Sequence, residues 1–351
     1  MIRTDRITRR AALLGAGALA AGTAFAQDLR EVVDSAGRRV RVPAQVRRVY
    51  AAGPPASILL FALAPEALIG WTSAFREAER PFVDAKYADL PVLGRLTGRG
   101  NTANAETVLA ARPDLIFDYG TINDTYVSLA DRVQEQTGIP YLLVDGAFDA
   151  IPKAFETLGA ILGRDAHAAD FARETRAALA DIASRIADIP PAARPRLYYA
   201  RGPRGLETGL EGSINVEAFE RIGATNVAAE LGRGGLAQVS FEQILRWNPD
   251  TIVTSDPNFR ANVFGDPAWR AVAAVRNRRV FLPPAVPFGW VDFPPSVNRL
   301  LGLRWLGRVL HPARFPEPLG PIVSAFFERH YHRAPTAAQL DAFVRTAEPP
   351  G

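Results

Sequence analysis

The amino-acid sequence predicts an α/β protein with two doubly wound lobes that are joined by a single long helix. Three observations predict this fold class. Short apolar strand patterns alternate with helical patterns, which is typical of parallel sheets. The pattern of residues 104–117 returns at residues 240–253, so the chain contains two similar units. Between the two units, residues 165–188 form a helical stretch without breakers.

The first 26 residues are predicted to be an export signal and not part of the fold. The basic pair Arg9 and Arg10 precedes an apolar run at residues 11–21, and residues 24–26 spell Ala-Phe-Ala. This is the order of a basic region, a short apolar region and a cleavage site. The arginine pair favours twin-arginine export, and an ordinary secretion signal is the alternative. We expect cleavage near Ala26 and a mature protein in the periplasm.

Composition excludes several classes of partner. The formal net charge of the chain is +4, and the signal holds four arginines against one aspartate. The mature chain is therefore near neutral, and it has no basic stripe with interleaved aromatics, so we expect no binding to nucleic acid. Cysteine is absent, which leaves no disulfide and no residue to carry a lipid anchor. We expect a free monomer.

Residues 27–164 are predicted to form the N-terminal lobe. A hairpin at 30–43 shows alternating strands on both sides of a Ser-Ala-Gly turn. The elements that follow alternate between strand and helix: strand 46–51, helix 56–63, strand 68–71, helix 104–111, strand 114–118, helix 123–136 and strand 140–144.

Each repeated segment predicts a short helix, a turn and a buried strand. A capping residue, Asn104 or Ser240, stands two positions before a glutamate, Glu106 or Glu242. The capping side chain accepts a hydrogen bond from the first turn, and the glutamate meets the positive end of the helix dipole. Pro-Asp then ends the helix in both copies, and an apolar run follows.

The connecting helix is assigned to residues 165–190, and Pro190-Pro191 ends it. Residues 191–351 are predicted to form the C-terminal lobe. Its elements again alternate before a helical tail: strand 196–200, helices 214–222 and 240–247, strands 250–254 and 279–282, helix 295–309, and two helices within 318–346.

Four segments in a fixed order carry a resemblance to a known family. They are VVDSAGRRVRVPAQVRRV, NAETVLAARPDLIF, GLEGSINVEAFERIGATNVAAE and SFEQILRWNPDTIV. Together they resemble periplasmic binding proteins for iron complexes and cobalamin, over essentially the whole mature chain. The resemblance implies two lobes linked by one helix, a ligand cleft between the lobes, and delivery of the ligand to an ABC importer in the inner membrane.

The same resemblance implies a role for the two repeated glutamates. In that family each lobe presents a surface glutamate to arginines of the permease, and here these positions are Glu106 and Glu242. One exposed carboxylate on each lobe would fix the orientation of docking. The alternative is that each glutamate only stabilises the N-terminus of its helix.

Ligands of open α/β sheets bind at the carboxyl ends of strands, so the loops after the strands supply the candidate ligand-binding residues. Aromatics offer contact area, and arginine can bind an anion. Tyr119 and Trp290 also match positions where cobalamin-binding relatives place aromatics, although core packing is their alternative role. For Arg201 the alternative is a solvated loop, and Asp292 is expected to orient its loop. The candidates are Ser57, Trp71, Arg95, Tyr119, Arg201, Ser255 and Trp290.

The ligand class follows from what the chain lacks. No histidine falls in a predicted cleft loop, and His330 and His332 are expected at a solvated helix end. Bare zinc is therefore disfavoured, and an iron complex of a siderophore type is favoured. Cobalamin, haem and molybdate or tungstate are the alternatives: Arg95 and Arg201 would suit an anion, and Tyr119 is the candidate haem ligand.

No enzymatic motif is found in the sequence. It contains no G-x-S-x-G motif, no cysteine nucleophile and no G-x-x-x-x-G-K-[ST] loop. We therefore predict a binding protein without catalytic residues or a cofactor. An exported enzyme or a ligand sensor on the same scaffold remains the alternative, because a fold does not fix a function.

Overall fold

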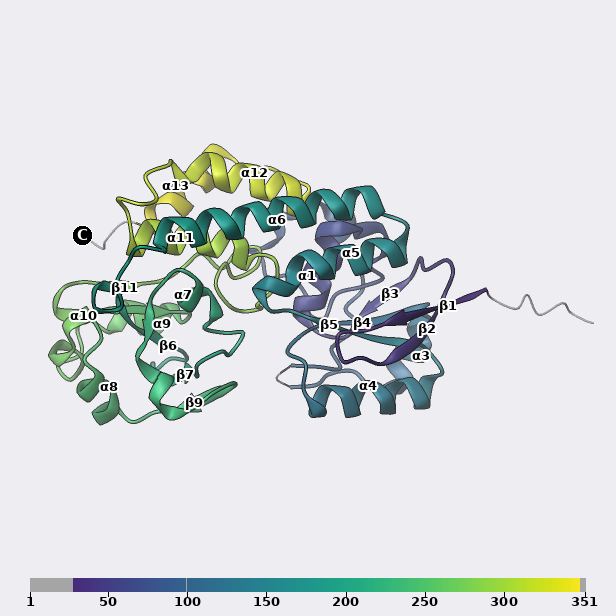
Figure 1. Ribbon diagram of the computed structural model, residues 1–351, viewed down its shortest axis with the longest axis horizontal. Coiled ribbons are helices and arrows are strands. Elements are labelled where there is room, and N and C mark those ends of the chain that lie inside the picture. The colour runs from purple at the N-terminus through teal and green to yellow at the C-terminus, as the bar shows by residue number, and fades with distance from the viewer. Residues whose placement is uncertain (1–27, 99, 348–351) are drawn as a thin grey trace, which may run out of the picture.

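The computed structural model describes residues 28–98 and 100–347 and has two α/β lobes (Figure 1). The predicted export signal lies outside the described residues. The N-terminal lobe holds a parallel sheet in the order β3 (Val49–Ala51), β4 (Leu115–Gly120), β5 (Tyr141–Asp145). The C-terminal lobe holds a second parallel sheet in the order β11 (Val280–Phe281), β10 (Thr251–Thr254), β6 (Arg196–Ala200), β8 (Thr225–Asn226). The predicted fold class is confirmed.

Helices cover both sheets, and a hairpin of β1 (Leu29–Val33) and β2 (Arg39–Pro43) flanks the first one. The α-helices of the N-terminal lobe are α1 (Pro54–Leu63), α2 (Ala85–Ala88), α3 (Ala105–Ala111), α4 (Asp124–Thr137) and α5 (Ile151–Leu162). Those after the connecting helix are α7 (Glu217–Arg221), α8 (Phe241–Trp247), α9 (Pro257–Asn262), α10 (Ala273–Arg276), α11 (Arg299–Leu310), α12 (Leu319–Tyr331) and α13 (Ala337–Arg345).

Helix α6 (Asp165–Ile186) extends along one side of both lobes, next to α11 and α12 (Figure 1). One large apolar cluster lies beneath these helices and draws residues from both lobes, such as Phe155, Phe171, Tyr199 and Leu303. Each sheet also packs a smaller cluster on its other face. The lobes therefore share a core on the α6 side, and relative movement between them is restricted there.

Some local predictions differ from the structure. Residues 68–71 form only isolated bridges, because Leu68 pairs with Val49 while Trp71 pairs with Val92. Helix α5 and the antiparallel pair β7 (Glu207–Gly209) and β9 (Leu236–Gln238) were not predicted. The helix end at His330 is not solvated: the residue is 7% exposed, and its ring stacks on Phe326 with centroids 4.0 Å apart.

Candidate functional site: a cavity between the lobes

A cavity of about 790 Å³ lies between the lobes, and both contribute to its wall. Its N-terminal wall includes the start of α1, the end of β4 and residues 71–75. Its C-terminal wall includes the end of β6, residues 212–215, and the loop between β11 and α11. The cavity is therefore at the carboxyl ends of parallel strands, where ligands of α/β folds bind.

Aromatic side chains form one side of the cavity. The rings of Trp71 and Phe75 meet edge to face with centroids 4.8 Å apart, and Phe288 from the other lobe lies 5.9 Å from both. The Trp71 indole nitrogen donates to the carbonyl of Tyr87 at 2.7 Å, which fixes the ring. Ser57 also lines the cavity, and its hydroxyl donates to the Pro54 carbonyl at 2.8 Å. This wall offers apolar contact with little side-chain freedom to lose.

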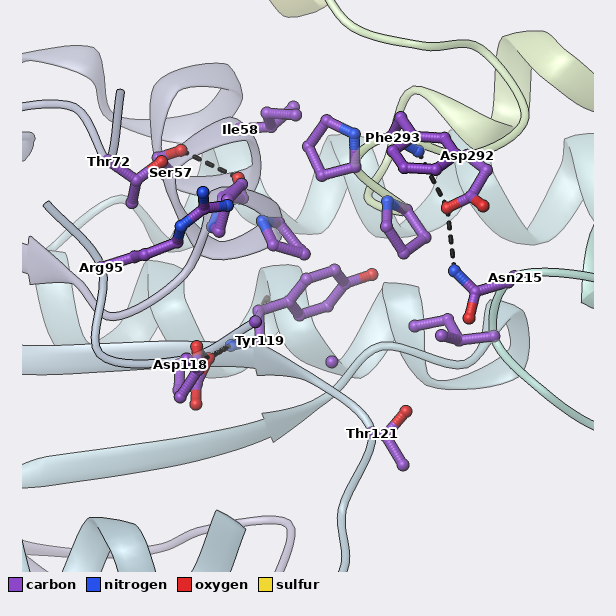
Figure 2. Close-up of a pocket in the computed structure, with 18 of the residues that line it drawn as sticks. Ser57, Ile58, Thr72, Arg95, Asp118, Tyr119, Thr121, Asn215, Asp292 and Phe293 are labelled. Atoms are coloured by element: carbon purple, nitrogen blue, oxygen red, sulfur yellow. Dashed lines mark hydrogen bonds between the residues drawn. The ribbon is translucent and has the colours of Figure 1, made fainter. Parts of the chain in front are cut away.

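A buried carboxylate, Asp118, lies on the floor of the cavity at the end of β4 (Figure 2). Its Oδ1 accepts from the Thr97 hydroxyl at 3.2 Å and from the Tyr119 N–H at 3.0 Å, while Oδ2 accepts from the Tyr141 hydroxyl at 3.1 Å. Burial raises the pKa of Asp118 to about 6, and the hydrogen bonds oppose that rise.

Tyr119 points across the cavity toward Asn215 of the other lobe (Figure 2). The side chain is 1% exposed, and burial raises the pKa of its phenol far above the usual value. The positive charge of Arg299 opposes this rise. The Tyr119 hydroxyl is itself buried and interacts with the side chain of Arg299.

Arg95 brings positive charge to the cavity wall (Figure 2). Its Nε donates to the carbonyl of Gly100 at 3.1 Å, and no carboxylate of residues 28–98 or 100–347 forms an ion pair with it. By contrast, the carboxylate of Glu79 on the same wall is neutralised by Arg76. Arg95 is thus available to an anionic ligand.

Arg201 reaches the cavity but is not free to bind an anion. It is 3% exposed and forms a buried ion pair with Asp292, while its Nε donates to Glu207 at 2.9 Å. Tyr199 and Asn215 also donate to the Asp292 carboxylate, each at 2.9 Å. Asp292 therefore orients Arg201 and its own loop, and the sequence-based hypothesis of an anion-binding Arg201 is not supported by this geometry.

Five of the seven predicted ligand-binding residues line the cavity, and two do not. Trp290 is fully buried and packs on Phe327 and Phe343 at centroid distances of 6.3 and 5.1 Å, so it belongs to the core. Ser255 lies behind the wall, where it interacts with the Tyr199 hydroxyl. The five are Ser57, Trp71, Arg95, Tyr119 and Arg201.

The sequence analysis missed several lining residues. Asp118 ends a predicted strand and Asn215 belongs to a predicted helix, while Phe75 and Phe293 lie in loops, so the signals were present but weak. Main examples are Phe75, Thr97, Asp118, Asn215 and Phe293.

Neither a metal site nor a membrane span is found in the part of the chain that the structure describes. No group of three or more His, Cys, Asp or Glu side chains there is arranged to hold a metal ion. No described helix is both long and apolar enough to cross a membrane.

A family model for periplasmic binding proteins matches residues 81–287, which is more than half of the chain. The chain belongs to the periplasmic binding protein family. A solved ABC transporter solute binding protein from Sulfurospirillum deleyianum is 30% identical to it, with a TM-score of 0.81 over 90% of this chain and 99% of that one. The resemblance found in the sequence is confirmed.

Two further relatives have named ligands. The molybdate-binding protein MolA of Haemophilus influenzae is 26% identical over 86% of this chain and 91% of the relative. The solved structure of MolA with molybdate shares the fold, with a TM-score of 0.72 at 23% identity over 88% of this chain and 99% of that one. A cobalamin-binding protein of Halobacterium salinarum is 29% identical over 52% of this chain and 49% of the relative.

This periplasmic binding protein is thus the substrate-binding protein of an ABC transporter, an exported protein that binds a small molecule and works with a permease. Its relatives are binding proteins, which agrees with the prediction that the chain is not an enzyme.

Helices α3 and α8 expose the two repeated glutamates at matching positions. Glu106 and Glu242 are both exposed in the first turns, and neither forms an ion pair within the described residues. One turn later each helix exposes a leucine, Leu109 at 47% and Leu245 at 38%. The two helices therefore present a similar surface, one on each lobe.

Proposed function

We propose that this protein captures a metal complex of a bulky organic chelator, such as a ferric siderophore, between its lobes and delivers it to the permease of an ABC importer. The observation that carries the proposal is the cavity: it has a volume of about 790 Å³ and a wall rich in aromatic and proline side chains. Organic ligands of this size bind in apolar cavities of roughly 300–1,000 Å³ that hold a few polar groups.

The absence of a metal-binding cluster within the described residues fits a metal that arrives already chelated. The chelator then supplies the metal ligands, and the protein needs to recognise only the outer surface of the complex. Arg95 provides one positive charge without a carboxylate partner among the described residues, and Trp71, Phe75 and Phe288 provide apolar contact. This set matches a complex with a modest negative charge and a largely organic surface.

Molybdate or tungstate is the second candidate. It is favoured by the free charge of Arg95 and by the relation to MolA, which extends over most of the chain. Against it stands the size of the cavity, which is far larger than a tetrahedral oxyanion and would have to close around it. Cobalamin and haem remain alternatives of the bulky organic class. For haem, Tyr119 is the candidate axial ligand on the cavity wall.

Export and docking complete the proposal. The signal at residues 1–26 would direct twin-arginine export, and cleavage near Ala26 would release the mature protein. Glu106 and Glu242 would then contact the permease from the two lobes. Their exposure, their lack of ion pairs among the described residues and their equivalent places in α3 and α8 support this role.

Tryptophan fluorescence of residues 27–351 tests the ligand class, because Trp71 lines the cavity while the other four tryptophans do not. The titrants are the ferric complexes of desferrioxamine B and citrate, cyanocobalamin, haemin and sodium molybdate. We expect saturable submicromolar binding of a ferric complex, measured in parallel by isothermal titration calorimetry.

Trp71→Phe is the control. It should abolish most of the fluorescence change and keep calorimetric binding, since the substituted ring still fills the aromatic wall. If molybdate is the one titrant that binds with a submicromolar Kd, the ligand belongs to the oxyanion class. Binding of none of the titrants would contradict the proposal.

A further inference from the structure

Phe293 is an unusual residue on the cavity wall. Its side chain is 52% exposed although phenylalanine is apolar, and its backbone has a positive φ of 59°. A bulky residue in the left-handed region is rare and costs free energy, and such residues cluster at ligand sites. The side chain lines the cavity near Asp292 and opposite Arg95 (Figure 2).

The loop holds Phe293 in this conformation through several contacts. The Phe293 N–H donates to Asp292 Oδ1 at 2.8 Å, and its carbonyl accepts from the N–H of Gly289 at 3.1 Å. Gly289 has no space for a side chain, because a Cβ there would lie 1.9 Å from the Asp292 carbonyl oxygen. The backbone of residues 289–293 is thus closely packed, and the Phe293 ring faces the cavity.

Arg201 packs against one face of the Phe293 ring. The guanidinium carbon lies 4.3 Å from the centre of the Phe293 ring, at cation–π distance. Arg201 is itself fixed by Asp292 and Glu207, so the flat guanidinium cannot turn away. A buried ion pair adds little net stability compared with apolar packing. The position that the Arg201–Asp292 pair gives to the guanidinium is therefore the better explanation for the presence of this pair.

We propose that Phe293 is a ligand-binding residue that packs against an apolar or flat face of the ligand, and that Arg201 and Asp292 are positioning residues for it. The inference rests on the proposed function and narrows the class of ligand. One face of the ring is stacked on Arg201, and the exposed remainder is available to a ligand. Aromatic side chains held rigidly in advance lose little entropy when they bind.

This role selects between the ligand classes. A hydroxamate or catecholate chelate, a corrin or a porphyrin presents carbon surface that the ring of Phe293 can cover. A tetrahedral oxyanion presents only oxygen atoms and would gain nothing from it. Phe293 therefore favours a metal complex with an organic shell over molybdate.

Calorimetric titration of four mature proteins tests the contact: wild type, Phe293→Ala, Phe293→Tyr and Val33→Ala. Val33 is the control, because it is 58% exposed on β1 and does not line the cavity. The probes are the ferric complex of desferrioxamine B, cyanocobalamin and sodium molybdate. We expect Phe293→Ala to raise the Kd of an organic complex at least tenfold, and the other two variants to stay within twofold of wild type.

The outcomes separate the inference from the proposed function. If wild type binds an organic complex and Phe293→Ala binds it equally well, only the role of Phe293 is overturned. If wild type binds none of the probes, the proposed function and the role of Phe293 both fail. If wild type binds molybdate and Phe293→Ala weakens it tenfold, the packing against an organic face is wrong.

Thermal unfolding without ligand tests the strained backbone independently. At position 293 we expect glycine to give a higher Tm than alanine, because only glycine adopts a positive φ freely. At Val33, where φ is not positive, we expect alanine to give the higher Tm. If the glycine and alanine variants show the same order of Tm at both positions, the claim that Phe293 is held in a strained conformation is wrong.

Discussion

Arg299 joins the two lobes by donating from Nη2 to the backbone carbonyl of Gly146, which follows the last strand of the N-terminal sheet. Arg299 begins α11, is fully buried and also pairs with Glu217 at 3.0 Å. Glu217 in turn accepts the N–H of Phe148 at 2.9 Å, and the guanidinium lies 4.3 Å from the Phe148 ring centre. A buried charge pair of one lobe thus holds the backbone of the other.

This connection predicts a large loss of stability for Arg299→Met. The substitution leaves the partly buried Glu217 without its main partner and removes the bond to Gly146, so we expect the free energy of unfolding to fall by about 3–5 kcal/mol. Arg304→Met on the same helix is the control: Arg304 pairs with Asp181 nearer the surface, and about 1 kcal/mol or less is expected. Urea unfolding measures both, and equal losses would contradict the role of Arg299.

The same residue should limit closure of the lobes. Because α6, the shared core and the Arg299 bonds all restrain movement, we expect ligand binding to change the radius of gyration of the wild type very little. In Arg299→Met the change should be larger. Small-angle scattering with and without ligand measures it, and a large change in the wild type would contradict a restrained hinge.

Asp118 predicts a specific dependence of stability on pH. Its pKa is about 6 in the folded protein and about 3.9 in an unfolded chain. Between these values the folded state binds more protons than the unfolded state, so stability falls as pH rises from about 4 to 6 and then levels off. The shift corresponds to a loss of roughly 3 kcal/mol.

Asp118→Asn should remove this dependence, since the amide can still accept from Thr97 and Tyr119 and can donate to Tyr141. In urea unfolding from pH 4 to 7, the free energy of unfolding of Asp118→Asn should rise relative to that of the wild type as pH rises. Thr97→Val is the matched variant: without that donor the pKa of Asp118 rises further, and the decline extends to higher pH. Parallel profiles for Asp118→Asn and wild type would contradict the raised pKa.

Local signals in the sequence predicted much of the fold because they act over a few residues. Asn104 accepts from the Thr107 N–H at 3.0 Å, and Ser240 forms a capping box with Gln243, as the repeats suggested. The buried strands after Pro113 and Pro249 likewise follow from a short apolar run after a helix stop. These features need no information from distant parts of the chain.

The cavity was predicted less completely because its details depend on distant contacts. Arg201 looked available to an anion, but its partner Asp292 is 91 positions away. Trp71 and Trp290 had the same signal, an aromatic in a predicted loop, and both are buried. Phe327 and Phe343 of α12 and α13 pack on Trp290, while Trp71 lines the cavity. Periodicity does not reveal such pairings, and only the packed structure separates the two roles.

The matched surfaces of α3 and α8 predict a transport defect without a binding defect. In Glu106→Ala with Glu242→Ala, both exposed carboxylates that are proposed to contact the permease are lost, while the cavity is untouched. We expect ligand affinity within twofold of wild type and uptake reduced at least tenfold in cells that express the importer, since charged contacts mainly set the orientation and rate of docking.

The control for this prediction is Glu135→Ala with Glu328→Ala, which removes two other exposed carboxylates, from α4 and α12. Uptake should then stay near wild type. Leu109→Ser with Leu245→Ser extends the test to the apolar part of the same surfaces, and a partial defect is expected because each leucine lies one turn from its glutamate. Undiminished uptake in the double glutamate variant would show that the permease is contacted elsewhere, and the glutamates would then serve only their helix N-termini.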